Sequence, residues 1–397
     1  MGEQPRTDPP IPVEVAITDA YGALRTAGRR ADGGWESRRA STHGAWPAWE
    51  PGARRIAVSS VDLLGGTSAI ELVVPSGEAQ QTIFRSAPSG TPVIAPGVPH
   101  YVAWSPAGTF ISYVAQTQGG LALHVAAPGG MDAGRVVATG APLFSCWAPD
   151  ERSIAVHAGA DLALYDPADV EHPRVVSGAA AGFRTPAFSP DGAYLIYATP
   201  AAPGAAVMAY EVGSGAETEI ARFPGAVAFA FRPGTMDIDV AVSHRPETGV
   251  FEEIFRLSGD AWHERVRLWK GASVAYFHAP GGDRMAIVLP AQTGDGRYTI
   301  RVVDNSGGTL GATEAVFLSG PYRTLLSFFD QYRISHCLWA PDGSVFLIAG
   351  RMPGDGVHAT FGDPVNLILA WRGRRSEPLN PISEGEIGFF PPPAVLA

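Results

Sequence analysis

The sequence contains few of the residues that mark several common protein classes. Its 397 residues include two cysteines, Cys146 and Cys337, and a single lysine, Lys270. Two thiols in a chain of this length cannot form a disulfide framework, so we expect both to be buried structural thiols. No apolar run approaches the roughly 18 residues that a membrane-spanning helix needs. These shortages argue against a disulfide-rich secreted domain and against a helical membrane protein.

The chain is also short of positive charge. It carries 29 basic and 39 acidic residues, a formal net charge of −10. Nucleic acid and anionic membranes repel such a chain, so neither is expected as a partner, and direct membrane insertion is not expected. The first residues contain no apolar signal segment, which predicts a cytoplasmic location. The excess of arginine over lysine, with abundant alanine, glycine and proline, is typical of genome composition bias.

Glycine and proline, in contrast, are abundant, at 47 and 35 residues. Glycine weakens helices and proline breaks them, so long helices are disfavoured. A disordered chain is excluded as well, because 46% of the residues are hydrophobic. The composition predicts many short strands that are joined by many turns.

One short motif recurs along the chain: an aromatic residue, any residue, then proline. The copies are Trp49-Glu-Pro51, Trp104-Ser-Pro106, Trp147-Ala-Pro149, Phe188-Ser-Pro190, Phe231-Arg-Pro233 and Trp339-Ala-Pro341, with His278-Ala-Pro280 in the same register and a degenerate copy at Phe389-Phe-Pro-Pro392. The first seven prolines are 41 to 61 residues apart, which is about the length of one propeller blade. The repeat therefore predicts an all-β fold, a single β-propeller.

Each copy has the same internal order. An apolar run leads to the aromatic residue, a turn of the Pro-Asp-Gly type follows, and a second run such as Tyr194–Tyr197 completes a hairpin. Third and fourth runs come after a variable loop, as at Leu162–Asp166 and Thr299–Asp304. Four antiparallel strands in each unit, repeated around an axis, make the blades of a propeller.

The two ends of the chain are expected to meet in one blade. Residues 13–19 and 23–26 are interpreted as its third and fourth strands, and Glu386–Phe390 as its first strand. Counted in this way the ring has eight blades, with seven as the close alternative. We expect residues 1–397 to form a single domain, with about residues 1–12 as a disordered extension.

The Trp/Phe-Ser-Pro-Asp-Gly unit resembles the TolB-like (PD40, WD40-like) propeller repeat, which also occurs in the propeller domain of prolyl-oligopeptidase-type peptidases. The resemblance spans nearly the whole chain. It implies a bacterial propeller that binds a protein or peptide at the funnel of the ring, beside an envelope or transport apparatus. The expected cytoplasmic location departs from that of periplasmic TolB.

Histidines near the channel are the first candidates for a site. His100 and His336 precede their tryptophans by a few residues, and Tyr101 and Arg184 occupy similar positions, so all four are expected near the mouth of the channel. The histidines could bind zinc together, but histidines that bond to backbone or water are the favoured interpretation. We expect His278 to pack in the core.

A stretch that lies outside the repeat supplies the remaining candidates. Residues 325–336 mix aromatic and charged side chains, and they form either a recognition element at the funnel or an aromatic plug in the channel. We expect exposed, ligand-binding side chains at Asp330, Gln331, Tyr332 and Arg333, joined by His358 from a later loop. The carboxylates Asp237 and Asp239 are expected in a solvated turn.

The sequence favours a non-enzymatic scaffold that binds a protein or peptide. It contains no Gly-x-Ser-x-Gly elbow, His-Glu-x-x-His, Cys-x-x-Cys or phosphate loop, so no catalytic residue, metal or cofactor is predicted. Two alternatives remain open. One is an enzyme with its site in the channel, such as a lyase, a glycosidase or a metal-dependent hydrolase. The other is a regulatory subunit of a separate peptidase or transporter.

Overall fold

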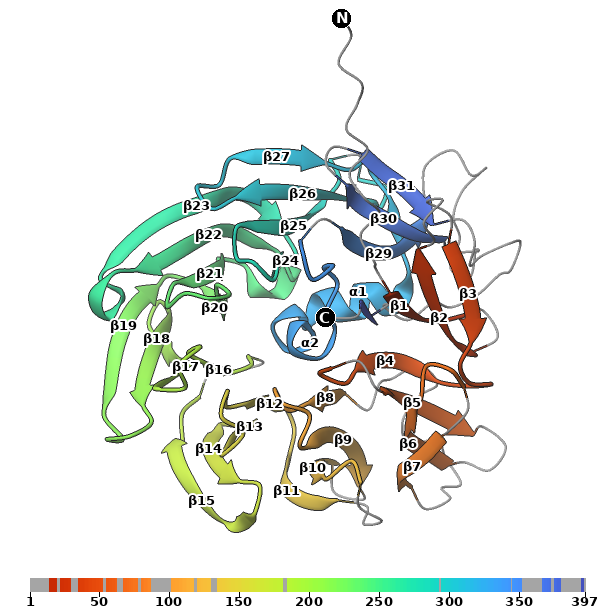
Figure 1. The fold of residues 1–397 in the computed structure, drawn as a ribbon. Helices are drawn as coiled ribbons and strands as arrows, with labels where there is room; N and C mark the ends of the chain where they lie inside the picture. The colour runs from red at the N-terminus through yellow and green to blue at the C-terminus, as the bar shows by residue number, and fades with distance from the viewer. Residues whose placement is uncertain are drawn as a thin grey trace, which may run out of the picture.

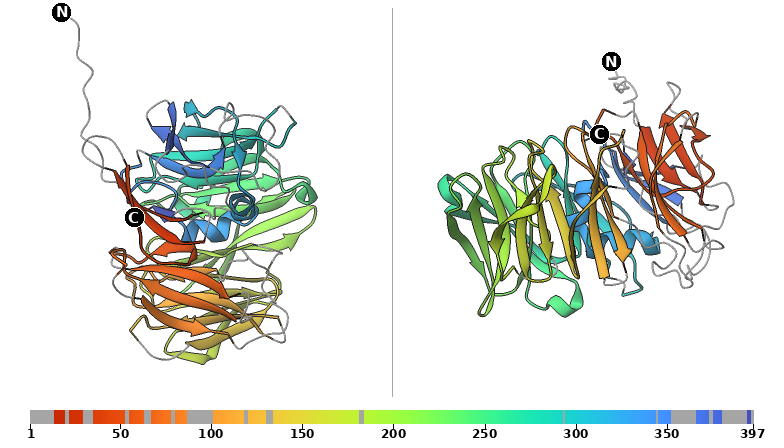
Figure 2. Two further views of the ribbon diagram at one scale, coloured as in Figure 1. Left: turned by 90° about the vertical axis from the view of Figure 1, so that its right-hand side faces the viewer. Right: turned by 90° about the horizontal axis from the view of Figure 1, so that it is seen from below.

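A computed structural model describes most of the chain (Figures 1 and 2). The described residues are 14–19, 22–29, 35–52, 55–62, 67–77, 80–86, 101–117, 120–129, 134–180, 184–292, 294–343, 345–351, 366–372, 375–379 and 394–395. Their strands form four-stranded antiparallel sheets that follow one another around a central axis (Figure 1). The expected all-β propeller of four-stranded blades is therefore confirmed.

Seven of the eight sheets consist of four consecutive strands. The first three are β4 (Ala45–Trp49), β5 (Ile56–Asp62), β6 (Thr67–Val73), β7 (Gln80–Arg85); β8 (Val102–Trp104), β9 (Ile111–Thr117), β10 (Gly120–Ala126), β11 (Arg135–Gly140); and β12 (Leu143–Trp147), β13 (Ile154–Ala158), β14 (Asp161–Asp166), β15 (Asp169–Ser177). The next two are β16 (Ala187–Phe188), β17 (Tyr194–Ala201), β18 (Gly204–Glu211), β19 (Glu217–Phe223); and β20 (Ala226–Phe231), β21 (Ile238–Ser243), β22 (Phe251–Ser258), β23 (Glu264–Ser273). The last two are β24 (Ala275–His278), β25 (Arg284–Pro290), β26 (Tyr298–Asp304), β27 (Thr309–Ala312); and β28 (Phe317–Leu318), β29 (Phe346–Arg351), β30 (Asn366–Arg372), β31 (Arg375–Leu379).

The remaining sheet joins the two ends of the chain. Its order is β3 (Trp35–Arg39), β2 (Leu24–Arg29), β1 (Glu14–Thr18) and β32 (Ala394–Val395). The N-terminal strands thus occupy the second and third positions of their sheet, and the expected third and fourth positions are wrong, because β3 supplies the outermost strand. The expected first strand, residues 386–390, and the expected extension, residues 1–12, lie outside the described residues. The strand that pairs with β1 is β32, through Val15↔Val395 and Ala16↔Ala394.

The recurring aromatic residue marks the end of the innermost strand in successive blades. Trp49, Trp104 and Trp147 are the last residues of β4, β8 and β12. Phe188, Phe231 and His278 end β16, β20 and β24 in the same way. The hairpin predicted from the repeat is therefore confirmed in each of these blades, and the motif places an aromatic ring, or the ring of His278, at one end of the channel.

In the two copies of the motif that carry a serine, this serine stabilises the turn after the aromatic residue. The Ser105 hydroxyl accepts a hydrogen bond from the amide of Phe110, and the Ser189 hydroxyl accepts one from the amide of Tyr194, each at 2.9 Å. Both serines are fully buried. The serine thus satisfies an amide that the tight turn would otherwise leave without a partner.

The innermost strand of the β28–β31 blade is interrupted by a helical hairpin. Helices α1 (Gly320–Ser327) and α2 (Phe329–Ser335) follow β28, and the chain returns to the same blade at the bridge between Trp339 and Phe346. The Ser319 hydroxyl begins α1 by accepting a hydrogen bond from the amide of Tyr322. This insertion explains why the last interval between motif prolines is the longest one.

The two helices fill the centre of the ring (Figures 1 and 2). Helix α2 contacts β8, β12, β20 and β24, which belong to four different blades. Phe329 is 1% exposed and packs its ring against Phe251, Tyr276 and Phe277. Of the two interpretations of residues 325–336, the aromatic plug in the channel is the one the structure shows.

Tryptophan side chains connect one blade to the next. The indole Nε1 of Trp104 donates a hydrogen bond to the carbonyl of Ala48 in the preceding blade, at 3.0 Å. Trp147 donates to the Ser112 hydroxyl at 3.1 Å, and Trp339 donates to the carbonyl of Phe277 at 3.0 Å. The repeated tryptophan therefore joins blades as well as packing between them.

Replacing Trp104 by Phe tests this connection. Phenylalanine keeps most of the buried ring but removes the N–H group, so the hydrogen bond between the blades at the carbonyl of Ala48 is lost. We expect Trp104→Phe to lower the free energy of unfolding by about 1–2 kcal/mol, measured by chemical denaturation. Val175→Ala is the control, because Val175 is 70% exposed on the outer strand β15. Equal stabilities of the two variants would contradict the proposed connection.

Candidate functional site

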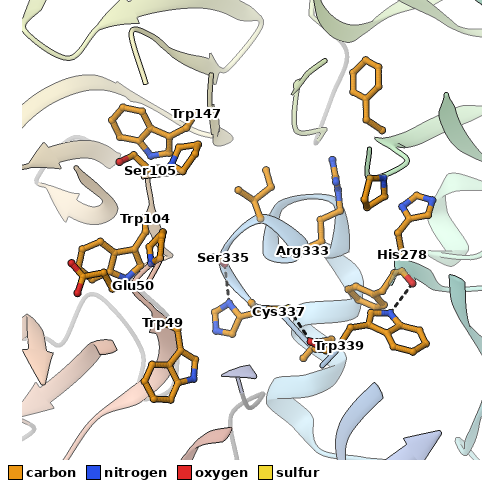
Figure 3. A pocket seen from close by; sticks show the side chains of 18 of the residues that line it. Trp49, Glu50, Trp104, Ser105, Trp147, His278, Arg333, Ser335, Cys337 and Trp339 are labelled. Carbon is orange, nitrogen blue, oxygen red and sulfur yellow. Dashed lines mark hydrogen bonds between the residues drawn. The ribbon is translucent and has the colours of Figure 1, made fainter. Parts of the chain in front are cut away.

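A pocket of about 550 Å³ lies at the end of the channel where the aromatic-x-Pro turns meet (Figure 3). Its volume falls within the range of roughly 300–1,000 Å³ that is typical of ligand sites. The inner strands and their turns contribute Trp49, Glu50, Pro51, Gly52, Trp104, Ser105, Pro106, Trp147, Phe231, Pro233, Phe277, His278 and Trp339. The end of α2 and the residues after it contribute Arg333, Ile334, Ser335, His336, Cys337 and Leu338.

Three tryptophans form one wall of the pocket. Trp49, Trp104 and Trp147 follow one another along this wall, with the chain after α2 opposite them (Figure 3). They come from three consecutive blades, because the repeat places one aromatic ring at the end of each inner strand. The wall presents flat apolar surface that suits aromatic or aliphatic groups.

Glu50 is the acidic residue of this wall, and it is already neutralised. Its carboxylate accepts two hydrogen bonds from the guanidinium of Arg55, at 2.6 and 3.0 Å. The same guanidinium lies over the ring of Trp104, with 5.5 Å between its carbon and the ring centroid. Glu50 therefore orients Arg55 against the tryptophan wall and brings little free negative charge to the pocket.

On the opposite side an imidazole replaces the aromatic ring of the repeat. Nε2 of His278 lies 2.8 Å from a carboxylate oxygen of Asp239, which is 0% exposed. Arg256 donates two hydrogen bonds to the same carboxylate, each at 2.8 Å. Burial alone would raise the pKa of Asp239, but the hydrogen bonds from His278 and Arg256 lower it below its usual value. The carboxylate stays ionised and fixes the His278 ring.

These contacts correct two expectations from the sequence. Asp239 lies within β21 and not in a solvated turn, where solvent would have left it without fixed partners. His278 occupies the aromatic position, as expected, but its ring lines the pocket in addition to packing against Tyr276. The sequence could not reveal this pair, because its members are 39 residues apart in adjacent blades.

The last turn of helix α2 places Arg333 in the floor of the pocket. Within the described part of the chain, no hydrogen bond or ion pair is formed by this side chain, and its buried Nε atom has no partner. A guanidinium carries five N–H donors in a planar fork. Arg333 therefore brings unused donors and an unneutralised positive charge to the pocket.

His336 and Cys337 follow helix α2 and complete the floor. Burial lowers the pKa of His336 to about 3, so its ring is neutral near pH 7; Nδ1 lies 2.8 Å from the Ser335 hydroxyl. Burial raises the pKa of Cys337, and its thiol donates to the carbonyl of Trp339. Cys146 is buried elsewhere, as expected of a structural thiol, whereas Cys337 is partly exposed in the pocket, so the expectation of a buried thiol is wrong for it. Both floor residues are neutral at physiological pH.

The structure divides the candidates proposed from the sequence into three groups. Arg333 and His336 line the pocket. Tyr101, Asp330, Gln331 and Tyr332 are buried between α2 and the inner strands, and Arg184 lies over the ring of Phe251. His100 and His358 lie outside the described residues. Tyr101 and Arg184 precede the inner strands of their blades, whereas this pocket lies at the opposite end of these strands.

The burial of Asp330 contradicts its expected exposure. The side chain is 1% exposed, and one carboxylate oxygen accepts a hydrogen bond from the amide of Thr185 at 3.0 Å. Gln331 and Tyr332 are buried as well; the hydroxyl of Tyr101 donates to the carbonyl of Gln331, and Trp46 stacks on the ring of Tyr332. The reason is that α2 lies inside the channel, so its polar residues meet the inner strands instead of solvent.

Other features can be stated only for the part of the chain that the structure describes. There, no three histidine, cysteine or acidic side chains come together as ligands for a metal ion. Neither described helix has the length and apolarity needed to cross a membrane. The pocket is thus defined by tryptophans, one buried Asp–His pair and one unpaired arginine.

Asp330 provides a test of how the plug is anchored. Replacing it by Ala leaves the buried amide of Thr185 without an acceptor, so we expect the free energy of unfolding to fall by about 1–3 kcal/mol. Asp330→Asn is the matched control, because it keeps an acceptor oxygen at the same position and should be less destabilised. The measurement is chemical denaturation followed by circular dichroism. If Asp330→Ala were as stable as the wild type, the hydrogen bond between Asp330 and Thr185 would not be what anchors the plug.

Comparison with known proteins agrees with the fold. No family model matches the chain, and no curated protein matches it. A structure from a study of two prolyl endopeptidases is similar, with a TM-score of 0.55 and 11% identity over 84% of this chain and 49% of that one. The dihydro-heme d1 dehydrogenase NirN gives a TM-score of 0.55 and 13% identity over 96% of this chain and 78% of that one. TolB from Acinetobacter baumannii gives a TM-score of 0.43 and 13% identity over 74% of this chain and 77% of that one. At these identities the likeness is one of fold alone, and it agrees with the β-propeller that the described strands form.

Proposed function

We propose that this propeller is a binding scaffold that takes a segment of a protein or peptide into the pocket at the end of its channel. The observation that carries the proposal is the pocket of about 550 Å³, which has a tryptophan wall on one side and α2 as its floor. Aromatic side chains arranged in this way contribute much of the energy of recognition sites. Because α2 fills the centre of the ring, a ligand enters the pocket from the turn side.

The state of the ionisable groups in the pocket supports binding over catalysis. Glu50 is held by Arg55, and the thiol of Cys337 is held by the carbonyl of Trp339. The buried ring of His336 is neutral near pH 7 because its pKa is lowered to about 3. A general acid or base works best with a pKa near the operating pH. These three groups therefore serve the shape of the pocket better than they would serve proton transfer.

One observation favours the rival proposal, an enzyme with its site in the same pocket. Asp239 fixes the ring of His278, and a carboxylate behind an imidazole is an arrangement that general bases use. We prefer the scaffold because the described pocket places no activated nucleophile beside His278: the Cys337 thiol is kept protonated by its raised pKa, and Ser105 is fully buried in its turn.

The scaffold proposal predicts that a cap on Cys337 blocks ligand binding. Peptides are first selected from a displayed library against the full chain. Reaction of Cys337 with methyl methanethiosulfonate places a small group in the pocket, so we expect the selected peptides to lose at least tenfold in affinity. Dithiothreitol removes the cap and should restore binding. The affinity is measured by isothermal titration calorimetry.

The chain contains its own control for this experiment. Cys337→Ser has no thiol in the pocket, and the other cysteine, Cys146, is buried, so treatment of this variant should leave binding unchanged. The raised pKa of Cys337 lowers its thiolate fraction at neutral pH, so the capping reaction is run at alkaline pH. Peptides that bind equally well before and after complete capping would exclude the pocket as the site.

We further propose that the sheet of β1, β2, β3 and β32 closes the ring. The pairs Val15↔Val395 and Ala16↔Ala394 support this proposal, because they connect strands from the two ends of the chain. Removing residues 393–397 leaves the inner edge of β1 unpaired, so the melting temperature should fall by several degrees. Differential scanning calorimetry measures the change. A truncated chain with the same melting temperature as the full chain would show that closure does not depend on β32.

A further inference from the structure

We propose that the pocket contains a carboxylate-binding subsite made by Arg333 and His278. This inference rests on the proposed function and specifies the ligand. The bound peptide presents a carboxylate next to an apolar or aromatic side chain, and that side chain lies on the wall of Trp49, Trp104 and Trp147. Both polar residues line the pocket, on the side away from this wall (Figure 3).

Arg333 supplies the charge. Ion pairs join many of the described arginines to carboxylates, including Arg55 to Glu50 and Arg256 to Asp239 at the edge of the same pocket. Arg333 forms no such pair within the described residues, and its buried Nε atom has no hydrogen-bond partner. A guanidinium in this state has lost part of its hydration without compensation from the protein. A ligand carboxylate supplies that compensation through two parallel hydrogen bonds.

The nearest acidic residue on the same helix forms no ion pair with Arg333 within the described residues. Asp330 precedes it by about one turn of α2, one oxygen of its carboxylate accepts a hydrogen bond from the amide of Thr185, and Asp330 does not line the pocket. Glu50, the acidic residue that does line the pocket, is held by Arg55. The positive charge of Arg333 is thus available to a ligand.

His278 supplies a second donor in a fixed orientation when its ring is protonated. It stands where six copies of the repeat carry Trp or Phe, so its ring brings polarity to a position that the fold needs only for packing. Asp239 and Arg256 form a buried pair of opposite charges behind it, and Nε2 faces that pair. Nδ1 makes no hydrogen bond within the described residues. When the ring is protonated, Nδ1 can donate to a ligand carboxylate.

The choice of a peptide carboxylate follows from the shape of the pocket. The pocket of about 550 Å³ is much larger than a single small anion, so an isolated inorganic anion would leave most of it unfilled. An acidic side chain beside a phenylalanine, or a terminal carboxylate on a phenylalanine, fills both parts. These two sources share one chemistry, and the probes below separate them.

The test uses four synthetic probes with the full chain. One pair is acetyl-Gly-Phe-Asp-Gly-amide and its Asn counterpart, which tests an acidic side chain. The other pair is acetyl-Gly-Gly-Phe with a free carboxylate and with a terminal amide. Intrinsic tryptophan fluorescence reports binding, because four tryptophans line the pocket: Trp49, Trp104, Trp147 and Trp339. We expect at least one acidic probe to bind at least tenfold more tightly than its neutral counterpart.

Variants assign this preference to the two residues. Arg333→Met should reduce the preference for the acidic probe to less than threefold, and Arg333→Lys should retain part of it. The matched control is Arg152→Met, which removes the same charge from another turn at this end of the ring, where the side chain is 88% exposed. His278→Phe introduces the residue type that other copies of the repeat carry at this position, and Asp239 keeps its hydrogen bonds from Arg256, so the variant should fold. It should lose part of the preference for the acidic probe.

Each possible result decides the proposal. Equal binding of acidic and neutral probes, or equal effects of Arg333→Met and Arg152→Met, would reject the carboxylate subsite while peptide binding in the pocket stands. Failure of all four probes to bind at millimolar concentration would also reject the subsite. The scaffold itself is then judged by the capping of Cys337 with displayed peptides, which uses no acidic probe. Circular dichroism confirms that each variant is folded.

Discussion

The hydrogen bond that a tryptophan indole donates to the preceding blade is the interaction on which the rest of this structure depends. Trp104 bonds to Ala48 in this way, and Trp339 bonds to Phe277. A donor that must reach the neighbouring blade fixes the ring at the end of the inner strand. Because these ends meet around the channel, the rings that join the blades also line the pocket. One constraint on folding thus provides the surface for recognition.

The repeat let the sequence predict the parts of the fold that follow it. Inner strands end at Trp49, Trp104 and Trp147 because the same aromatic-x-Pro turn follows each of them. The plug could not be predicted in the same way. Helices α1 and α2 have only 8 and 7 residues, and helices this short are stable mainly through tertiary contacts. The contacts of α2 come from four blades and α1 contacts β29 of another, so no local pattern in residues 320–335 could show them.

The candidate site shows the same limit at the level of single residues. Asp330 and Arg333 are three positions apart and looked alike as exposed polar residues. In the channel, Asp330 accepts a hydrogen bond from the amide of Thr185, whereas Arg333 lines the pocket. His278 was visible in the sequence as a departure from the repeat. Its meaning depends on Asp239 in the preceding blade, and only the folded ring brings the two together.

The polar groups that we assign to ligand binding lie where the repeat is broken. Copies that keep the aromatic residue give the pocket apolar surface, and this surface is similar from blade to blade. Polarity enters at the copy where His278 replaces that residue and at the blade whose inner strand is interrupted by the plug that carries Arg333. These two blades are adjacent in the chain. The repeated positions therefore build the ring. The departures from the repeat lie on one side of the pocket, and they make that side polar and positively charged.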